Sequence, residues 1–227
     1  MESLSVATQS TLQASASLYP PIRVFLLPGG MLPQRMSAGA AGFDVYVRAV
    51  VSATQLDEEG RFRRTLFDFE SLPDPNVDPY TYYRVIRKPD GSLAYRLNAG
   101  ERVTLGIGFA TEFPFPEFFW VSPRSGLASK QGITIGNAPG TIDADYRGEA
   151  CVVLINGNIP SPHTDLPYVR SRATRIDFAF DITRGMRVAQ ALFGRAGVPE
   201  LQLVDNYESL ATSERGSGGL GSTGLVG

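Results

Sequence analysis

The sequence has only one cysteine and one histidine in 227 residues, and it has no long hydrophobic run. A single cysteine excludes an internal disulfide, and one cysteine with one histidine excludes a His/Cys zinc cluster within the chain. No apolar stretch approaches the ~20 residues of a membrane-spanning helix, so no membrane span is expected. The net charge of -2 gives no basic field for a nucleic-acid backbone. Membrane and nucleic acid are therefore not expected as partners.

Basic residues are also absent from the first twenty positions, which are rich in Ser and Thr. A secretory signal needs a basic start and a transit peptide needs arginines, so both are disfavoured. We expect residues 1–20 to be a disordered tail of a cytoplasmic protein. Cys151 lies in the apolar run 150–155 and is interpreted as a small buried residue rather than a reactive thiol.

The hydrophobic pattern is that of strands. Apolar residues alternate with small or polar ones over 103–110 and again over 175–182, the period of two of a half-buried strand. Leu201 and Leu203 suggest a further strand, and the run 150–155 is apolar on both faces, as in a strand inside a core. With 24 Gly and 16 Pro between these segments, the pattern predicts an all-β sandwich or barrel without a long helix.

Three segments fit that core less well. Residues 51–97 carry clustered acids and a loop signal at 72–79, and residues 157–174 are rich in Pro, Ser and Arg. We expect both to be surface insertions in one domain over 21–210. Glycine makes up half of the last twelve residues, so 211–227 is expected to be a flexible arm.

Three further segments suggest binding to an anion or a nucleotide. Residues 122–130 contain Arg124 and a short helix start at Ser125 or its neighbour, a plausible phosphate cradle. Residues 136–149 read as a hairpin that carries Asp143 and Tyr146, while 214–224 join an arginine to glycines and hydroxyls. Taken singly, the first segment is also compatible with a plain turn, the second with an acidic hairpin tip and the third with a disordered tail.

Together, and in this order, the motifs resemble the five signature motifs of the trimeric dUTPase family. The resemblance spans about residues 22 to 224 and rests on Ala41-Gly42-Phe43-Asp44-Val45, Pro123-Arg124-Ser125-Gly126-Leu127-Ala128, Asn137 through Asp143 to Gly148, Arg184-Gly185-Met186-Arg187-Val188-Ala189-Gln190, and Arg215 to Gly224.

The resemblance implies a jelly-roll-like distorted β barrel that forms a homotrimer with an exchanged C-terminal arm. It implies hydrolysis of dUTP to dUMP and pyrophosphate, with Asp143 as the general base that activates water. The implied cofactor is Mg²⁺, contacted through water by Asp44 and Gln190. The residues implied to bind base and sugar are Asn137, Gly140, Thr141, Ile142 and Tyr146, and those implied to bind phosphate are Arg124, Ser125, Gly126, Gln190, Arg215, Gly219, Leu220, Gly221, Ser222 and Thr223.

Two positions depart from the family pattern. Leu220 stands where the family usually has an aromatic residue that stacks on the uracil. Met186 replaces an acid in the fourth motif, next to the retained Arg187 and Gln190. The first departure predicts weaker closure of the arm over the base.

Two alternative functions remain open at this point. One is a dCTP deaminase or a bifunctional deaminase-diphosphatase of the same superfamily. The other is a regulatory binding protein on this scaffold that uses the nucleotide as a switch, with the acidic segment within 51–97 as a partner surface.

Overall fold

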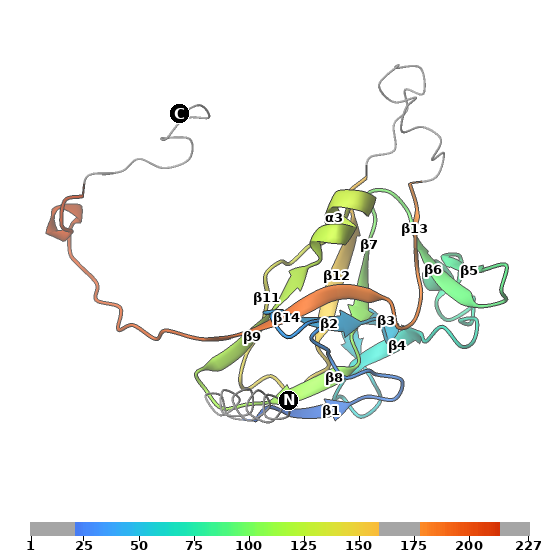
Figure 1. The fold of residues 1–227 in the computed structure, drawn as a ribbon, viewed down its shortest axis with the longest axis horizontal. Helices are drawn as coiled ribbons and strands as arrows, with labels where there is room; N and C mark the ends of the chain where they lie inside the picture. The colour runs from blue at the N-terminus through green and yellow to red at the C-terminus, as the bar shows by residue number, and fades with distance from the viewer. Residues whose placement is uncertain (1–20, 159–177, 214–227) are drawn as a thin grey trace, which may run out of the picture. The chain divides into compact units, whose positions relative to one another are not determined.

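The structure is a computed structural model that describes residues 21–158 and 178–213. These residues form many short strands, and their helices have at most seven residues. The expected all-β class is therefore confirmed (Figure 1). The strands are β1 Arg23–Leu26, β2 Phe43–Tyr46, β3 Ala49–Leu56, β4 Arg63–Phe67, β5 Val85–Arg87, β6 Leu93–Leu97, β7 Arg102–Gly106, β8 Phe109–Glu112, β9 Glu117–Pro123, β10 Ile133–Ile135, β11 Gly140–Ile142, β12 Cys151–Asn156, β13 Phe180–Ile182 and β14 Arg187–Arg195. The helices are α2 Pro79–Tyr82, α3 Ser125–Gln131 and the 3-10 helix η2 Tyr207–Ser209.

The strands form two larger and two smaller sheets. The larger sheets have the orders β10-β12-β7-β3-β4 and β11-β9-β14-β2, and the smaller ones are β1-β8 and β13-β6-β5. All pairings between these strands are antiparallel. One hydrophobic core contains Val45 and Phe119 from the four-stranded sheet together with Leu105 and Leu154 from the five-stranded sheet. The two larger sheets therefore share a single core.

The strand expected over 103–110 is divided in the structure. β7 ends at Gly106 and pairs with β12 and β3, whereas β8 begins at Phe109 and pairs with β1 in another sheet. Gly108 lies between them with a φ of 80°, which turns the chain out of the strand conformation. Gly30 packs so closely on this turn that a Cβ at Gly30 would overlap the carbonyl oxygen of Gly108. Period-two alternation persists through the turn, so the pattern did not reveal the break.

Two other expected strands are present. The run 150–155 forms β12, which lies between β10 and β7 in the five-stranded sheet. Its inner position matches the prediction of a core strand. The alternation over 175–182 appears as β13, which pairs with β6, while residues 175–177 lie outside the described part of the chain.

The expectation that 51–97 is a surface excursion is wrong. The segment contains most of β3 and all of β4, β5 and β6. β3 and β4 belong to the five-stranded sheet, and β5 and β6 belong to the three-stranded sheet. Phe67, Phe69, Leu93 and Tyr95 are buried in the core. Apolar side chains separated by acids and turns thus contribute to the core. The loop predicted at 72–79 is present over residues 72–78, which have no regular structure, and α2 starts at Pro79.

Residues 197–213 belong to a second compact unit that begins at Gly197, well before the expected arm start at 211. Apart from η2, these residues have no regular structure. The strand expected at Leu201 and Leu203 is absent from the single chain, where these side chains are 90% and 97% exposed. The tail 1–20, most of the insertion 157–174 and residues 214–227 of the arm lie outside the described residues. Among the described residues, no helix has both the length and the apolarity needed to cross a membrane.

Candidate functional site

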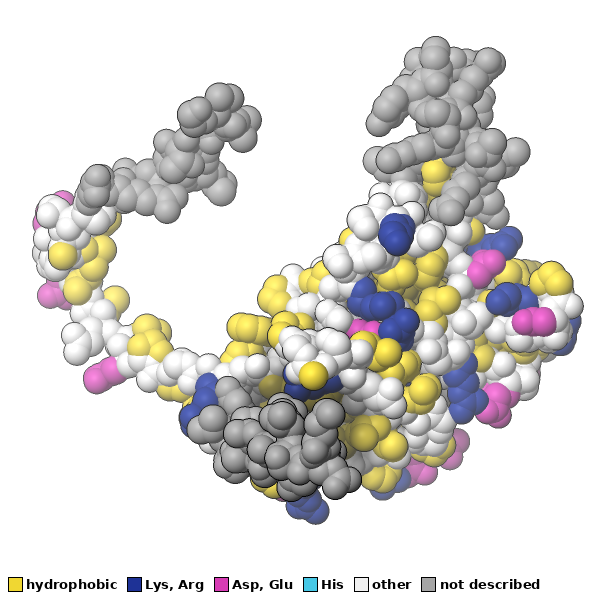
Figure 2. Space-filling view, in the orientation of Figure 1, with side chains coloured by type: hydrophobic (Ala, Val, Ile, Leu, Met, Phe, Trp, Pro, Cys, Tyr) yellow, Lys and Arg dark blue, Asp and Glu magenta, His cyan; other side chains and the backbone are white. Residues whose placement is uncertain are grey.

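The four-stranded sheet brings three of the five expected motifs together. Asp44 lies on β2, Gln190 on β14, and Ser122 near the end of β9, just before Arg124. In the sheet register Gln190 is directly opposite Asp44 on one side and Ser122 on the other. Directly opposed residues project from the same face of a sheet, so the three form one row. Figure 2 shows basic side chains gathered below α3, with an acidic side chain next to them.

The carboxylate of Asp44 is the centre of this row. Its side chain is only 3% exposed, and its two oxygens have separate partners. Nε2 of Gln190 donates to Oδ1 at 2.9 Å, and a guanidinium nitrogen of Arg187 donates to Oδ2 at 3.1 Å. Because a buried carboxylate needs charged or hydrogen-bonding partners, Arg187 and Gln190 compensate for the burial of Asp44 and fix its orientation.

Arg124 connects this row to α3. One guanidinium nitrogen donates to the carbonyl of Arg187 at 2.9 Å, and another lies 3.7 Å from Oδ2 of Asp44. Arg124 is also the N-cap residue of α3, so the expected short helix is present. No side chain caps that helix, and Ser125 and Gly126 are exposed at its first turn. The second motif therefore presents a cation and an open helix start beside the buried carboxylate.

The third motif forms the other edge of the same sheet. β11 pairs with β9, with Gly140 opposite Val121 and Thr141 opposite Trp120. Gly140 is constrained because a Cβ at this position would lie 2.9 Å from the amide nitrogen of Asn137. Asn137, Gly140, Thr141 and Ile142 thus belong to one hairpin end that is fixed to the sheet through β9.

Asp143 and Tyr146 are brought together by a turn after β11. The backbone N–H of Tyr146 donates to the carbonyl of Asp143 at 3.2 Å, and both side chains are exposed, Tyr146 to 37%. The Tyr146 hydroxyl donates to the carbonyl of Glu149 at 3.0 Å. Partial burial, followed by the charge interaction with Cys151, raises the pKa of Tyr146, so the phenol is protonated at neutral pH. The turn presents a carboxylate and an anchored ring to the outside of this chain.

Two contacts were missed by reasoning from sequence. Arg187 was noted only as part of a motif, although it is a direct partner of Asp44. The buried pair of Arg48 and Glu149, described below, was not foreseen at all. Its signal in the sequence is a glutamate placed directly before the apolar run 150–155, a position where a charge needs a partner. The expected phosphate-binding residues Arg215, Gly219, Leu220, Gly221, Ser222 and Thr223 lie outside the described residues.

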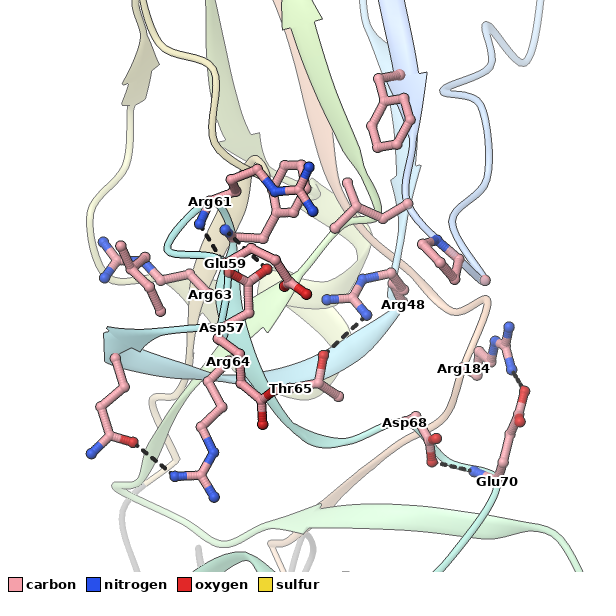
Figure 3. A pocket seen from close by; sticks show the side chains of 18 residues that line it. Arg48, Asp57, Glu59, Arg61, Arg63, Arg64, Thr65, Asp68, Glu70 and Arg184 are labelled. Carbon is pink, nitrogen blue, oxygen red and sulfur yellow. Dashed lines mark hydrogen bonds and ion pairs between the residues drawn. The ribbon is translucent and has the colours of Figure 1, made fainter.

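A cleft of about 1280 Å³ lies elsewhere, between β1 with its following loop and the β3–β4 hairpin (Figure 3). Phe62 at the hairpin tip stacks on Phe25 of β1, with ring centroids 6.1 Å apart. The lining contains five arginines and five acids, and Arg184 pairs there with Glu70. The two signs are equal in number, and no predicted site residue lines the cleft. The lining charges are Arg48, Arg61, Arg63, Arg64, Arg184, Asp57, Glu58, Glu59, Asp68 and Glu70.

Comparison with known proteins identifies the family. A family model described as dUTPase matches residues 94–160. The deoxyuridine 5'-triphosphate nucleotidohydrolase of Heliobacterium modesticaldum is 34% identical over 200 residues, which cover 88% of this chain and 93% of that protein. The chain belongs to the dUTPase family. A protein of the same name from Nautilia profundicola is 41% identical to this dUTPase-family chain over 128 residues, covering 56% of the chain and 75% of the relative.

Solved dUTPases have the same fold. A dUTPase of Staphylococcus bacteriophage 80alpha with dUpNHpp matches with a TM-score of 0.59 and 19% identity, covering 90% of this chain and 99% of that one. The dUTPase of phage phi11 of S. aureus, described with a structural Mg(II) ion, matches with a TM-score of 0.53 and 18% identity over 83% and 99% of the two chains. These matches confirm the expected jelly-roll-like β fold.

Proposed function

We propose that this chain is a dUTP diphosphatase, which hydrolyses dUTP to dUMP and pyrophosphate. The observation that carries the proposal is the row of Asp44, Gln190 and Ser122 on the sheet, with Arg124 beside Asp44 and the Asp143–Tyr146 turn after the far edge strand β11. Membership of the dUTPase family gives this arrangement its chemical meaning. It also disfavours the deaminase alternative.

Asp143 is the proposed general base. A water molecule attacks the α-phosphorus while Asp143 takes its proton, the bond from that phosphorus to the bridging oxygen breaks, and pyrophosphate leaves. An ordinary Asp, with a pKa of ~3.9, is a weak base, so correct placement of the water supplies much of the effect. The exposure of Asp143 on a turn supports this role, because the carboxylate is accessible to a bound nucleotide.

Arg124, with Ser125 and Gly126 at the start of α3, is proposed to hold the inner phosphates. A guanidinium group and backbone N–H groups are the donors that phosphate oxygens prefer. Arg124 is already oriented by its bond to the Arg187 carbonyl, which reduces the ordering needed when substrate binds. The terminal phosphate is assigned to Arg215, Ser222 and Thr223 of the arm.

The hairpin from Asn137 to Tyr146 is proposed to recognise the uracil and the sugar. Backbone groups near Gly140 and the Asn137 amide would match the donors and acceptors of uracil and leave those of cytosine unpaired, a large penalty. Thr141 and Ile142 continue this wall along β11. Tyr146 would pack on the deoxyribose and exclude a 2′-hydroxyl group.

Mg²⁺ is the proposed cofactor. Among the described residues there is no cluster of three or more acidic, His or Cys side chains able to enclose a metal ion. Asp44 stands alone as a carboxylate on its row and is already bonded to Gln190 and Arg187. This donor set suits an ion held mainly by substrate phosphates, with Asp44 and Gln190 bonded to its waters, because Mg²⁺ keeps several waters and needs few protein ligands. The bound ion would neutralise charge on the triphosphate.

A homotrimer with exchanged arms is the proposed assembly. Residues 197–213 expose Val198, Leu201, Leu203, Tyr207 and Leu210. Among them, Leu201 and Leu203 have the alternation of a strand. Apolar side chains this exposed are typical of surfaces covered by a partner. In the proposed trimer, a neighbouring subunit would cover these side chains, and the arm would lie over the active site of that neighbour.

Pyrophosphate release from dUTP, dCTP and dTTP in the presence of Mg²⁺ tests the proposal. We expect release from dUTP alone, and its loss in the Asp143→Asn variant with nucleotide binding retained. Ammonia release from dCTP would instead establish the deaminase. Tight dUTP binding without any hydrolysis would establish the regulatory binding protein.

A further inference from the structure

Glu149, which lies just before β12, is a fully buried carboxylate with a relative exposure of 0%. Its two oxygens accept from Nε and a terminal nitrogen of Arg48, both at 2.7 Å. Oε1 also accepts the backbone N–H of Gly108 at 2.9 Å. Arg48 uses its remaining terminal nitrogen to contact the hydroxyl of Thr65 on β4 at 3.3 Å, the contact drawn in Figure 3. The two side chains form a bidentate ion pair that is almost completely buried.

The surrounding backbone leaves room for this pair and for nothing larger. A Cβ at Gly106 would overlap Oε1 of Glu149, and a Cβ at Gly108 would lie 3.3 Å from Cβ of Arg48. The N–H of Arg48 also donates to the carbonyl of Gly106 at 2.9 Å. The position of Glu149 is therefore fixed from β7, from the segment between β2 and β3, and from β4.

Glu149 is also the residue on which the substrate-binding turn ends. Its backbone carbonyl accepts the Tyr146 hydroxyl at 3.0 Å and the Cys151 thiol at 3.3 Å. Gly148 is needed beneath the ring, because a Cβ there would overlap the Tyr146 hydroxyl. The place of the Tyr146 ring is thus set by the peptide that joins Glu149 to Ala150. That peptide is held by the Ala150 N–H, which donates to the Phe109 carbonyl at 2.9 Å, and through the Glu149 side chain by Arg48.

We propose that Arg48 and Glu149 are positioning residues for sugar selection: their buried ion pair fixes the Glu149 carbonyl, which holds the Tyr146 hydroxyl and keeps its ring where a 2′-hydroxyl group would collide. This inference rests on the proposed function, since it assumes that Tyr146 packs on the sugar. Neither Arg48 nor Glu149 touches substrate. They act through Tyr146, and they should affect the choice between deoxyribose and ribose more than the chemical step.

The experiment separates positioning from stability. Removing one partner leaves a buried charge without compensation, whereas replacing both with apolar residues is often close to neutral for folding. The test variant is therefore the double substitution Arg48→Met with Glu149→Leu, measured for thermal midpoint and for the ratio of kcat/KM with dUTP to kcat/KM with UTP. The control is Arg84→Met with Glu101→Leu. It removes a partly buried ion pair, with 3.1 Å between Nε of Arg84 and Oε2 of Glu101, that is not in contact with the turn.

We expect the double variant to lose selectivity for dUTP over UTP by about two- to tenfold, the effect of one hydrogen bond, and the control to keep it. Tyr146→Phe, which removes only the hydroxyl, should lose a similar factor. Combining it with the double variant should add little, because both changes break the same connection. Unchanged selectivity in Tyr146→Phe, or in a folded Arg48/Glu149 double variant, would overturn the proposal.

Failure of the proposed function has a different signature. If the wild-type protein leaves dUTP intact, its relative affinity for α,β-imido-dUTP and the ribose analogue still reports sugar selection without hydrolysis. A wild-type preference for the deoxy analogue that falls in the double variant would then support the positioning role alone. Equal affinities for the two analogues in the wild-type protein would refute it. If the double variant does not fold, Glu149→Gln and Tyr146→Phe decide by the same ratio.

Discussion

The Gln190 amide and the Asp44 carboxylate face each other across β14 and β2, joined by a 2.9 Å hydrogen bond. The two residues lie far apart in the sequence and in different motifs, yet they form one unit in the sheet. The bond means that Asp44 cannot reorient freely, so any water that bridges it to an ion has a defined direction.

Breaking this bond should weaken Mg²⁺ use. In Gln190→Ala, Asp44 keeps Arg187 but loses its Oδ1 partner, and outer-sphere changes of this kind typically cost ten- to hundredfold in metal affinity or activity. We expect a rise of about that size in the Mg²⁺ concentration needed for half-maximal dUTP hydrolysis. Gln55→Ala, an exposed glutamine on β3, is the control and should match the wild type. An unchanged Mg²⁺ requirement in Gln190→Ala would remove Gln190 from the metal role.

Gly30→Ala should strongly destabilise the fold. The added methyl group would overlap the Gly108 carbonyl, a backbone atom that cannot move aside without shifting β8. Overpacking of this kind costs about 1–3 kcal/mol, and sometimes more. Gly39 has open space around it, and Gly39→Ala should change the free energy of unfolding by no more than about 0.5 kcal/mol. Urea denaturation of both variants checks this, and equal midpoints would contradict the close packing.

Cys151 should be unreactive in the folded protein. Burial, aided by the charge of Glu149, raises the pKa of the thiol from 9.0 to about 12, so the reactive thiolate is scarce at pH 8. We expect no reaction with a disulfide reagent such as DTNB until denaturant is added. Rapid stoichiometric labelling of the native protein would show that the site opens.

The same thiol makes stability fall at alkaline pH. Because its pKa is higher in the folded than in the unfolded chain, its contribution is complete below pH ~9 and is lost as pH rises towards ~12, by at most about 1.4 kcal/mol per pH unit. Comparison of wild type with Cys151→Ala across this range isolates the effect. Parallel stability curves for the two proteins would be the contrary result.

Leu220→Phe should improve catalysis. The family usually has an aromatic residue here, and stacking contributes about 0.5–1.5 kcal/mol beyond area burial. This corresponds to a gain of roughly two- to tenfold in kcat/KM for dUTP. Leu225→Phe lies beyond the fifth motif and should have no such effect. An equal or lower kcat/KM in Leu220→Phe would count against the closing role of this position.

Local patterns predicted those parts of the fold that local forces decide. The apolar run 150–155 and the alternation up to Ile182 form strands, because their local pattern of apolar side chains favours a strand whichever strands pair with them. Leu201 and Leu203 have the same alternation but form no strand in the single chain, since a strand also needs an edge to pair with. The division between β7 and β8 depended on the φ of Gly108, which alternation does not encode.

The candidate site was predicted by motif order rather than by geometry. The motifs named Asp44, Arg124 and Gln190, but only the structure shows that Asp44 and Gln190 share a row of the sheet and that Arg124 lies beside Asp44. Arg48 and Glu149 could not be paired from the sequence, because they lie 101 positions apart and meet only in the folded chain. Acidic spacing over 51–97 hid the buried Phe67 and Tyr95, since core side chains there are interrupted by turns.

The stack of Phe62 on Phe25 has a consequence for the access of a protease to the β3–β4 hairpin. It ties the tip of the β3–β4 hairpin to the first described strand, and a single aromatic contact contributes only ~1 kcal/mol. Three trypsin targets, Arg61, Arg63 and Arg64, lie at or just after that tip. Release of β1 would therefore expose this hairpin to trypsin, and the cleavage rate there would report how firmly the amino-terminal strand is docked.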